Sequence, residues 1–133
     1  RKPGGEITQK FTPQSTGKAE IKKEYLDAVR SALCGVVNEP RGTARNASIE
    51  GITVAGKTGT AQVIAMKKDH VPKDEEAIPW KYRDHAWFVA IAPAEAPEIA
   101  VAVIIEHGGH GGSVAAPIAK KLIEAYMAGR DQG

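Results

Sequence analysis

The sequence has 133 residues, a length that corresponds to one domain or to a piece of one. Its 42% of hydrophobic and 26% of charged residues are ordinary for a globular protein and exclude a disordered or fibrous chain. Because 18 Lys and Arg are interleaved with 16 Asp and Glu, and the net charge is only +2, we expect no nucleic-acid partner.

The N-terminal part is predicted to contain one helix. Residues 1–18, rich in Gly, Pro, Thr and Gln, are expected to form an extended lead-in. Over 19–37 apolar residues recur at the spacing of one helix face, which predicts an amphipathic helix. The residues of this apolar face are Ile21, Tyr25, Val29, Leu33 and Val36 or Val37. Pro40 ends the helix, because proline disfavours helical geometry in the residue before it.

The middle of the chain is predicted to contain three strands. β-Branched residues predict a strand over 52–64, and a long, charged, proline-containing loop over 65–84 follows it. Two apolar runs over 86–92 and 99–106 are joined by a short turn with two prolines. They predict an antiparallel hairpin whose strands are largely buried.

The last predicted element is a helix over 113–128, which Ser113 can cap. Its predicted apolar face comprises Val114, Ile118, Leu122, Ala125 and Tyr126. The order of elements indicates an α+β fold, with antiparallel β-sheet strands flanked by N- and C-terminal helices. No segment approaches the roughly 20 apolar residues that cross a bilayer, so we expect a soluble polypeptide. The single Cys34 cannot form an intrachain disulfide.

The stretch GITVAGKTGTAQV, residues 51–63, matches two unrelated catalytic signatures. Gly51 and the tripeptide 56–58 fit the phosphate-binding P-loop of nucleotide-binding proteins. A P-loop needs a buried strand before its first glycine and a helix after its lysine, but polar residues precede Gly51. The tripeptide 57–59, Lys-Thr-Gly, also fits the third signature of penicillin-interacting serine enzymes, which lies on a strand at a sheet edge. The predicted strand favours this second interpretation.

Several segments, in order along the chain, resemble one bacterial enzyme family. They are EPRGTA (39–44), GITVAGKTGTAQV, RDHAWFVAIAP, IAVAVIIEHGGHGG and AAPIAKKLIEAY. From about Tyr25 to Tyr126 the sequence resembles the C-terminal part of the transpeptidase domain of class B penicillin-binding proteins. Among these it is most similar to the penicillin-binding protein 2 group, the elongation-type peptidoglycan D,D-transpeptidases. The resemblance implies a partial penicillin-binding transpeptidase fold, which is serine β-lactamase-like.

The resemblance also implies roles for four residues. In this family a serine attacks a D-Ala-D-Ala stem peptide, and the acyl-enzyme passes to an amine on a neighbouring strand. Lys57 would organise protons and charge around the nucleophile, while Thr58 and Thr60 would hold the terminal carboxylate of the substrate or of a β-lactam antibiotic. The backbone N–H of Thr60 would be one oxyanion-hole donor, and Gly59 would keep the strand edge open. This chemistry requires no metal or organic cofactor.

Two further signatures of the family are not found convincingly in the sequence. The nucleophile lies in Ser-x-x-Lys, far upstream of Lys-Thr-Gly, with Ser-x-Asn between them. Residues 15–18, Ser-Thr-Gly-Lys, match the first only in letters, since Gly17 lies where a helix should begin and no Ser-x-Asn follows before Lys57. We therefore expect 19–133 to be the C-terminal portion of a transpeptidase domain that is inactive by itself.

The resemblance implies a location and partners for the parent protein. It predicts a periplasmic domain of an inner-membrane-anchored bacterial protein that works with a SEDS-family glycosyltransferase and elongation scaffold proteins. The missing nucleophile leaves a non-catalytic binding or assembly module as an alternative for this polypeptide. Self-association is a further prediction, because apolar surface that the rest of the domain would cover must otherwise face the solvent.

The four histidines do not predict a metal site. His107 and His110 lie in a glycine-rich bend, and together with His70 and His85 they fall short of a zinc constellation. A flexible bend with solvated imidazoles is the simpler interpretation.

Overall fold

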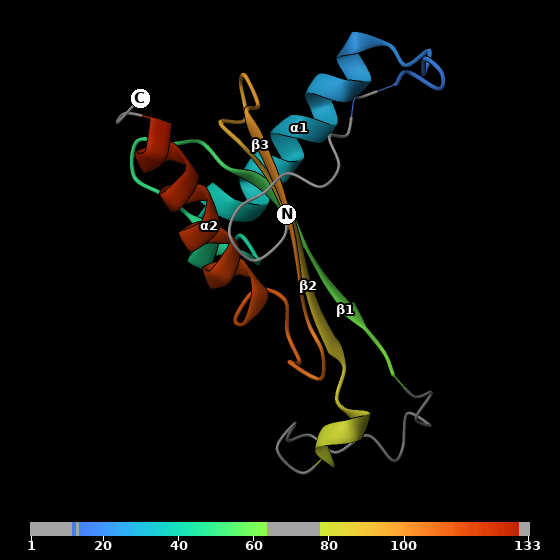
Figure 1. Cartoon of the computed structure of the whole chain (residues 1–133), viewed down its shortest axis with the longest axis vertical. Coiled ribbons are helices and arrows are strands. Elements are labelled where there is room, and N and C mark those ends of the chain that lie inside the picture. The colour runs from blue at the N-terminus through green and yellow to red at the C-terminus, as the bar shows by residue number, and fades with distance from the viewer. Residues whose placement is uncertain (1–11, 13, 64–77, 131–133) are drawn as a thin grey trace.

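The computed structural model describes residue 12 and residues 14–63 and 78–130. Its elements are α1 (Lys23–Asn38), η1 (Arg45–Ala47), β1 (Ala55–Ala61), η4 (Trp80–Tyr82), β2 (His85–Ala92), β3 (Ile99–Ile105) and α2 (Ala115–Arg130), as Figure 1 shows. The predicted α+β fold, with antiparallel strands between an N-terminal and a C-terminal helix, is confirmed. Most of the predicted lead-in and of the loop over 65–84 lies outside the described residues.

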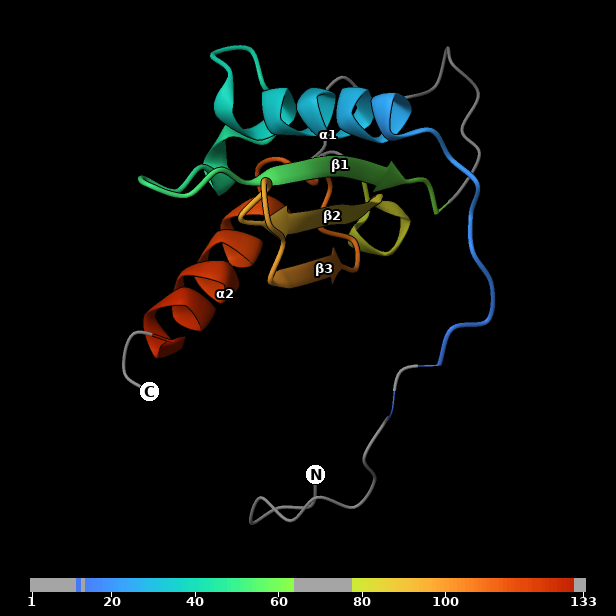
Figure 2. The same cartoon turned by 90° about the horizontal axis from the view of Figure 1, so that it is seen from above.

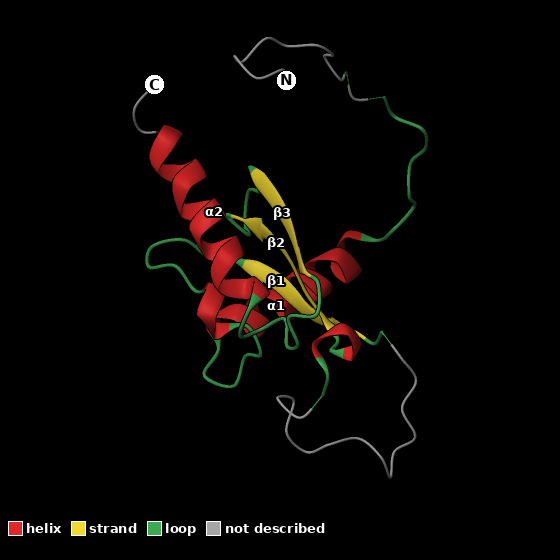
Figure 3. Cartoon of the chain, turned by 60° about the horizontal axis from the view of Figure 1, so that its bottom comes forward, coloured by secondary structure: helices red, strands yellow, loops and turns green. Residues whose placement is uncertain are grey.

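The three strands form one antiparallel sheet in the order β1-β2-β3. Figure 3 shows β1 and β3 on either side of β2. The register places Thr58 opposite Phe88, and Phe88 opposite Val103. The strand predicted over 52–64 is shorter in the structure, because Ile52 forms only an isolated bridge with Ile49. Within the described residues β1 pairs with β2 alone, so it is an edge strand.

The core lies between α2 and one face of the sheet. The buried residues of this face include Ala86, Phe88, Ala90, Ala92 and Val103. The residues that α2 buries are Ala115, Ala116, Ala119 and Ile123. The apolar face predicted for this helix is therefore wrong, since Ile118, Leu122 and Tyr126 are exposed. The buried face of α2 thus combines small alanine side chains, which allow close packing, with the larger Ile123.

The helix α1 lies on the other side of the sheet from α2, as Figure 1 and Figure 2 show. It contacts β1 and η1, and its one buried residue, Val37, lies near its C-terminal end. Of the apolar face predicted for this helix, Ile21, Tyr25 and Val29 are more than half exposed. The helical period was predicted correctly, but the described part of the chain leaves these residues largely exposed.

The sheet face opposite α2, which we call the open face, carries Trp87, Val89, Ile91, Ala100, Ala102 and Ile104. Trp87, Val89 and Ile104 are 38–46% exposed. The prediction that both hairpin strands are largely buried is therefore wrong for this face. Continuous apolar runs show that both faces are apolar, but they do not show what covers each one. None of the described helices is long and apolar enough to cross a membrane.

Candidate functional site

The tetrapeptide Lys57–Thr60 lies extended in β1, at the edge of the described sheet. A P-loop would require a turn and then a helix beginning at this lysine. The structure has a strand there instead, so the nucleotide-binding alternative is wrong. Gly59 lies directly against Trp87, because a Cβ added to the glycine would be 3.2 Å from the Cβ of Trp87.

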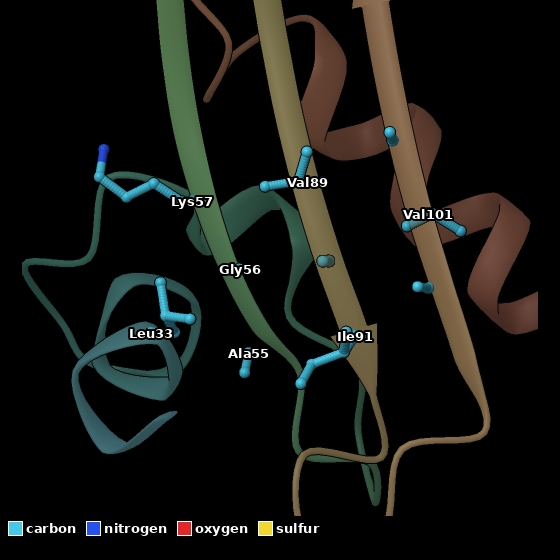
Figure 4. Close-up of a pocket in the computed structure, with 10 residues that line it drawn as sticks. Leu33, Ala55, Gly56, Lys57, Val89, Ile91 and Val101 are labelled. Carbon is cyan, nitrogen blue, oxygen red and sulfur yellow. The ribbon is translucent and has the colours of Figure 1, made fainter. Parts of the chain in front are cut away.

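Strand geometry divides the four residues between the two faces of the sheet. Side chains alternate along a strand, and directly paired residues share a face. Lys57 pairs with Val89 on the open face, whereas Thr58 pairs with Phe88 on the core face. Gly59 follows the face of Lys57, and Thr60 follows that of Thr58. Figure 4 shows Lys57 extending from β1 on the side of the strand where α1 lies.

The exposed edge of β1 carries backbone groups that β2 does not use. The ammonium nitrogen of Lys57 donates to the backbone carbonyl of Thr58 over 2.7 Å, so this carbonyl faces away from β2. In an antiparallel ladder, alternate residues of an edge strand point both backbone groups outward. Thr60 has the same parity as Thr58, and we infer that its N–H faces the strand edge.

A pocket of about 520 Å³ lies beside this edge, and we call it the threonine pocket. Its lining includes Thr43, Arg45, Asn46, Thr58, Thr60 and His110. The hydroxyl oxygens of Thr43 and Thr58 are 3.2 Å apart, within hydrogen-bond distance. Several hydroxyl groups, an amide and a guanidinium thus surround one space. This donor set suits an anionic group such as a carboxylate.

The wall opposite β1 is formed by the segment that follows α1. Its path is fixed by backbone hydrogen bonds from the Gly42 N–H to the Glu39 carbonyl (3.0 Å) and from the Ala44 N–H to the Val36 carbonyl (2.9 Å). Gly42 packs directly against the C-terminal end of α1, because an added Cβ would be 2.3 Å from the Val36 carbonyl oxygen. The segment therefore presents Thr43 to β1 in a defined position.

The glycine-rich bend, residues 107–112, closes the third side of the pocket. A Cβ at Gly111 would be 2.1 Å from the Trp87 carbonyl oxygen and 2.7 Å from that of Gly59. At Gly112 a Cβ would be 2.1 Å from the Thr43 carbonyl oxygen. The Asn46 amide donates to the Gly112 carbonyl over 3.0 Å. Only residues without a side chain fit here, which explains the glycines.

The interpretation of this bend as flexible, with solvated imidazoles, is wrong for His107. Its ring centroid lies 4.4 Å from that of Trp80 and 4.8 Å from that of His85. Its backbone N–H donates to Nδ1 of His85 over 2.9 Å, and its φ of 55° is left-handed. Among the described residues no group of three His, Cys, Asp or Glu is arranged to hold a metal ion.

The start of α2 also differs from its prediction. The Ser113 hydroxyl donates to the His110 carbonyl over 3.1 Å, so it does not cap the first turn. The N–H groups of Ala115 and Ala116 donate instead to the Gly111 carbonyl, over 3.0 and 2.9 Å. The helix therefore begins on the same glycine that contacts β1 and β2.

A second, apolar pocket of about 350 Å³ lies on the open face. It is bounded by Leu33 of α1 and by Val89, Ile91, Ala100 and Ala102 of the sheet, and Figure 4 shows several of these residues. Lys57 lies at its rim. One face of β1 thus borders the apolar pocket, and the other borders the threonine pocket.

Two groups on α1 have shifted pKa values. The hydrogen bond from Lys23 is the main cause that lowers the pKa of Asp27, and the charges of Lys23 and Arg30 lower it further. Desolvation raises the pKa of the Cys34 thiol, and the nearby Glu95 carboxylate adds to this effect.

Comparison with known proteins gives a consistent result. Residues 4–124 match the sequence profile of the penicillin binding protein transpeptidase domain. The chain is 39% identical over 102 residues to the peptidoglycan D,D-transpeptidase MrdA of Haemophilus influenzae, which corresponds to 76% of this chain and 16% of that protein. Curated relatives of this kind are thus several times longer than the chain.

Solved structures resemble the fold as well. The structure of Pseudomonas aeruginosa PBP2 in complex with WCK 5153 has a TM-score of 0.58 and 41% identity, covering 75% of this chain and 18% of that one. The complex between PBP2 and MreC from Helicobacter pylori has a TM-score of 0.63 and 31% identity, covering 80% of this chain and 18% of that one.

Proposed function

The chain belongs to the family of penicillin-binding protein transpeptidase domains, and from this premise we propose that it supplies one wall of a peptidoglycan D,D-transpeptidase active site. The whole enzyme would cross-link stem peptides through an acyl-serine intermediate, and β-lactams would acylate the same serine. The observation that carries the proposal is the position of Lys57–Thr60 on an edge strand beside the threonine pocket.

Each residue of the tetrapeptide has a proposed task. Thr58 and Thr60 hold the terminal carboxylate of the stem peptide or the β-lactam through their hydroxyls, which line the threonine pocket. The outward N–H of Thr60 stabilises the developing oxyanion, a contribution of about 3 kcal/mol in comparable acyl-transfer sites. Lys57, on the other face of the strand, supplies positive charge near the nucleophile. Gly59 leaves the edge free of a side chain.

The nucleophile itself is not assigned to any residue of this chain. The Ser-x-x-Lys letters at 15–18 have no Ser-x-Asn between them and Lys57. We therefore propose that the polypeptide alone forms no acyl-enzyme.

A labelled penicillin tests both parts of the proposal. The 133-residue chain and the full-length protein that contains it are incubated with the label and separated on a denaturing gel. We expect a covalent band on the full-length protein that unlabelled penicillin prevents, and no band on the chain alone. A band on the chain alone would contradict the inactivity, and a blank full-length lane would contradict the function.

Two variants of the full-length protein test the roles of the threonines. Thr60→Val keeps the backbone N–H but removes the hydroxyl, so it should slow acylation by weakening carboxylate binding. The matched control is Thr53→Val, which changes a threonine outside both described pockets and should leave acylation unchanged. Equal rates for both variants and the wild type would refute the role of the Thr60 hydroxyl.

The relatives support a proposal for the location and partners of the whole protein. The PBP2 of Helicobacter pylori forms a complex with MreC, which supports an elongation scaffold partner for this family member. We propose a periplasmic domain of an inner-membrane-anchored protein that also works with a SEDS-family glycosyltransferase. Affinity purification of the full-length protein from membranes, followed by mass spectrometry, should recover both partners.

The exposed apolar residues support a second proposal, self-association of the isolated chain. Val89 and Ile104 are 46% and 43% exposed on the open face, which also carries the apolar pocket. Burying such a surface against a second copy removes apolar area from water. Sedimentation should show association that Val89→Lys reduces and that Leu122→Lys, a matched change at 49% exposure on α2, does not. A monomer at all concentrations would contradict the proposal.

A further inference from the structure

Thr58 has a hydroxyl partner that comes from a distant part of the sequence. The Thr43 and Thr58 hydroxyl oxygens are 3.2 Å apart, and either can be the donor. Thr43 belongs to the segment after α1, and no chemical role was assigned to it from the sequence. Because both side chains line the threonine pocket, a ligand held there by Thr58 would lie next to this pair.

The position of Thr43 is fixed from both sides. The Gly42 N–H donates to the carbonyl of Glu39, the residue that follows α1, and the Ala44 N–H donates to the Val36 carbonyl within α1. Its carbonyl is packed against Gly112, where a Cβ would be 2.1 Å away. The same hypothetical Cβ would be 3.5 Å from the methyl group of Thr58, so three segments meet around this side chain. Thr43 is therefore a rigidly placed partner even though its side chain is exposed.

We infer that Thr43 is a positioning residue that directs the hydroxyl proton of Thr58 toward the ligand carboxylate. A hydroxyl has one proton to donate and two lone pairs to accept. A carboxylate only accepts, so it binds Thr58 when the Thr58 proton is not given to Thr43. The arrangement that satisfies all three groups is a chain in which Thr43 donates to Thr58 and Thr58 donates to the carboxylate. Each bond in such a chain strengthens the next.

This inference rests on the proposed function, since it assigns to Thr58 a carboxylate ligand. It adds a residue outside the Lys-Thr-Gly motif and a direction for the hydrogen bond. Removing the Thr43 hydroxyl would let the Thr58 side chain turn and would leave its oxygen with one acceptor site unfilled. The loss should be that of one neutral hydrogen bond, about three- to tenfold in the rate constant for acylation.

The test is a double-mutant cycle in the full-length protein, measured as the second-order rate constant for acylation by a penicillin. We expect Thr43→Val to lower the constant about three- to tenfold and Thr43→Ser, which keeps the hydroxyl, to restore it to within about twofold. In a Thr58→Val background, Thr43→Val should have no further effect, because its partner hydroxyl is absent. Thermal unfolding of each variant monitors folding separately.

The outcomes separate the inference from the function on which it rests. If the wild type is not acylated, the proposed function fails. If the wild type is acylated and Thr43→Val matches it, or if the effects of the two valine variants multiply independently, the positioning role is overturned. If Thr43→Ser is as slow as Thr43→Val, the hydroxyl is not the active group and the role is likewise overturned.

Discussion

Replacing Gly111 by alanine should destabilise the fold through a clash with the backbone of the sheet. The new Cβ would be 2.1 Å from the Trp87 carbonyl oxygen, and real Cβ atoms essentially never come within 3.0 Å of another atom. The bend or β2 must therefore move by roughly 1 Å, an overpacking that costs about 1–3 kcal/mol. The same movement strains the hydrogen bonds from the first turn of α2 to the Gly111 carbonyl.

Equilibrium urea unfolding of the full chain, followed by far-UV circular dichroism and tryptophan fluorescence, measures this loss. The matched control is Gly129→Ala, because nothing lies within 4 Å of a Cβ added at this position in α2. Alanine favours a helix by up to about 1 kcal/mol over glycine, so the control should be neutral or more stable than the wild type. A Gly111→Ala variant as stable as the wild type would refute the close packing of the bend.

Further predictions concern the two helices. Ile123→Ala should lower the free energy of unfolding by about 2–5 kcal/mol, because Ile123 is fully buried, whereas Leu122→Ala at 49% exposure should cost much less in the same urea titration. Lys23 and Arg30 lower the pKa of Asp27 in the folded state. The contribution of Asp27 to stability is therefore present above its unfolded pKa and is lost as the pH falls through its lowered folded pKa. Asp27→Asn should remove this acid-side dependence, and an unchanged pH profile of the unfolding midpoint would contradict the assignment.

The sequence predicted the elements well where local pattern decides them. The β-branched residues around Lys57–Thr60 predicted a strand, and the structure has one there. The spacing of apolar residues predicted both helices, with ends that differ by a few residues from those of α1 and α2. These features depend on residues that are close in the chain.

Features that depend on distant residues were not predictable in this way. The sequence predicted an apolar face of α2 that includes Ile118 and Leu122, but packing against the sheet buries the face with Ala119 and Ile123 instead. The contact between Thr43 and Thr58 joins two segments whose relative position is a property of the fold. The packing of His107 on Trp80 likewise needs the end of the sheet to bring the two residues together.

The glycine-rich bend links the orientation of α2 to the strand that carries the motif. Gly111 accepts hydrogen bonds from the first turn of the helix and rests on the carbonyl groups of Gly59 and Trp87. Because no side chain separates Gly111 from these carbonyl groups, side-chain rotation cannot absorb a small displacement of the helix. A tilt of α2, imposed for example by whatever touches its exposed outer residues, would therefore shift the edge of β1 directly, and substitutions far along that helix would alter the threonine pocket without contacting it.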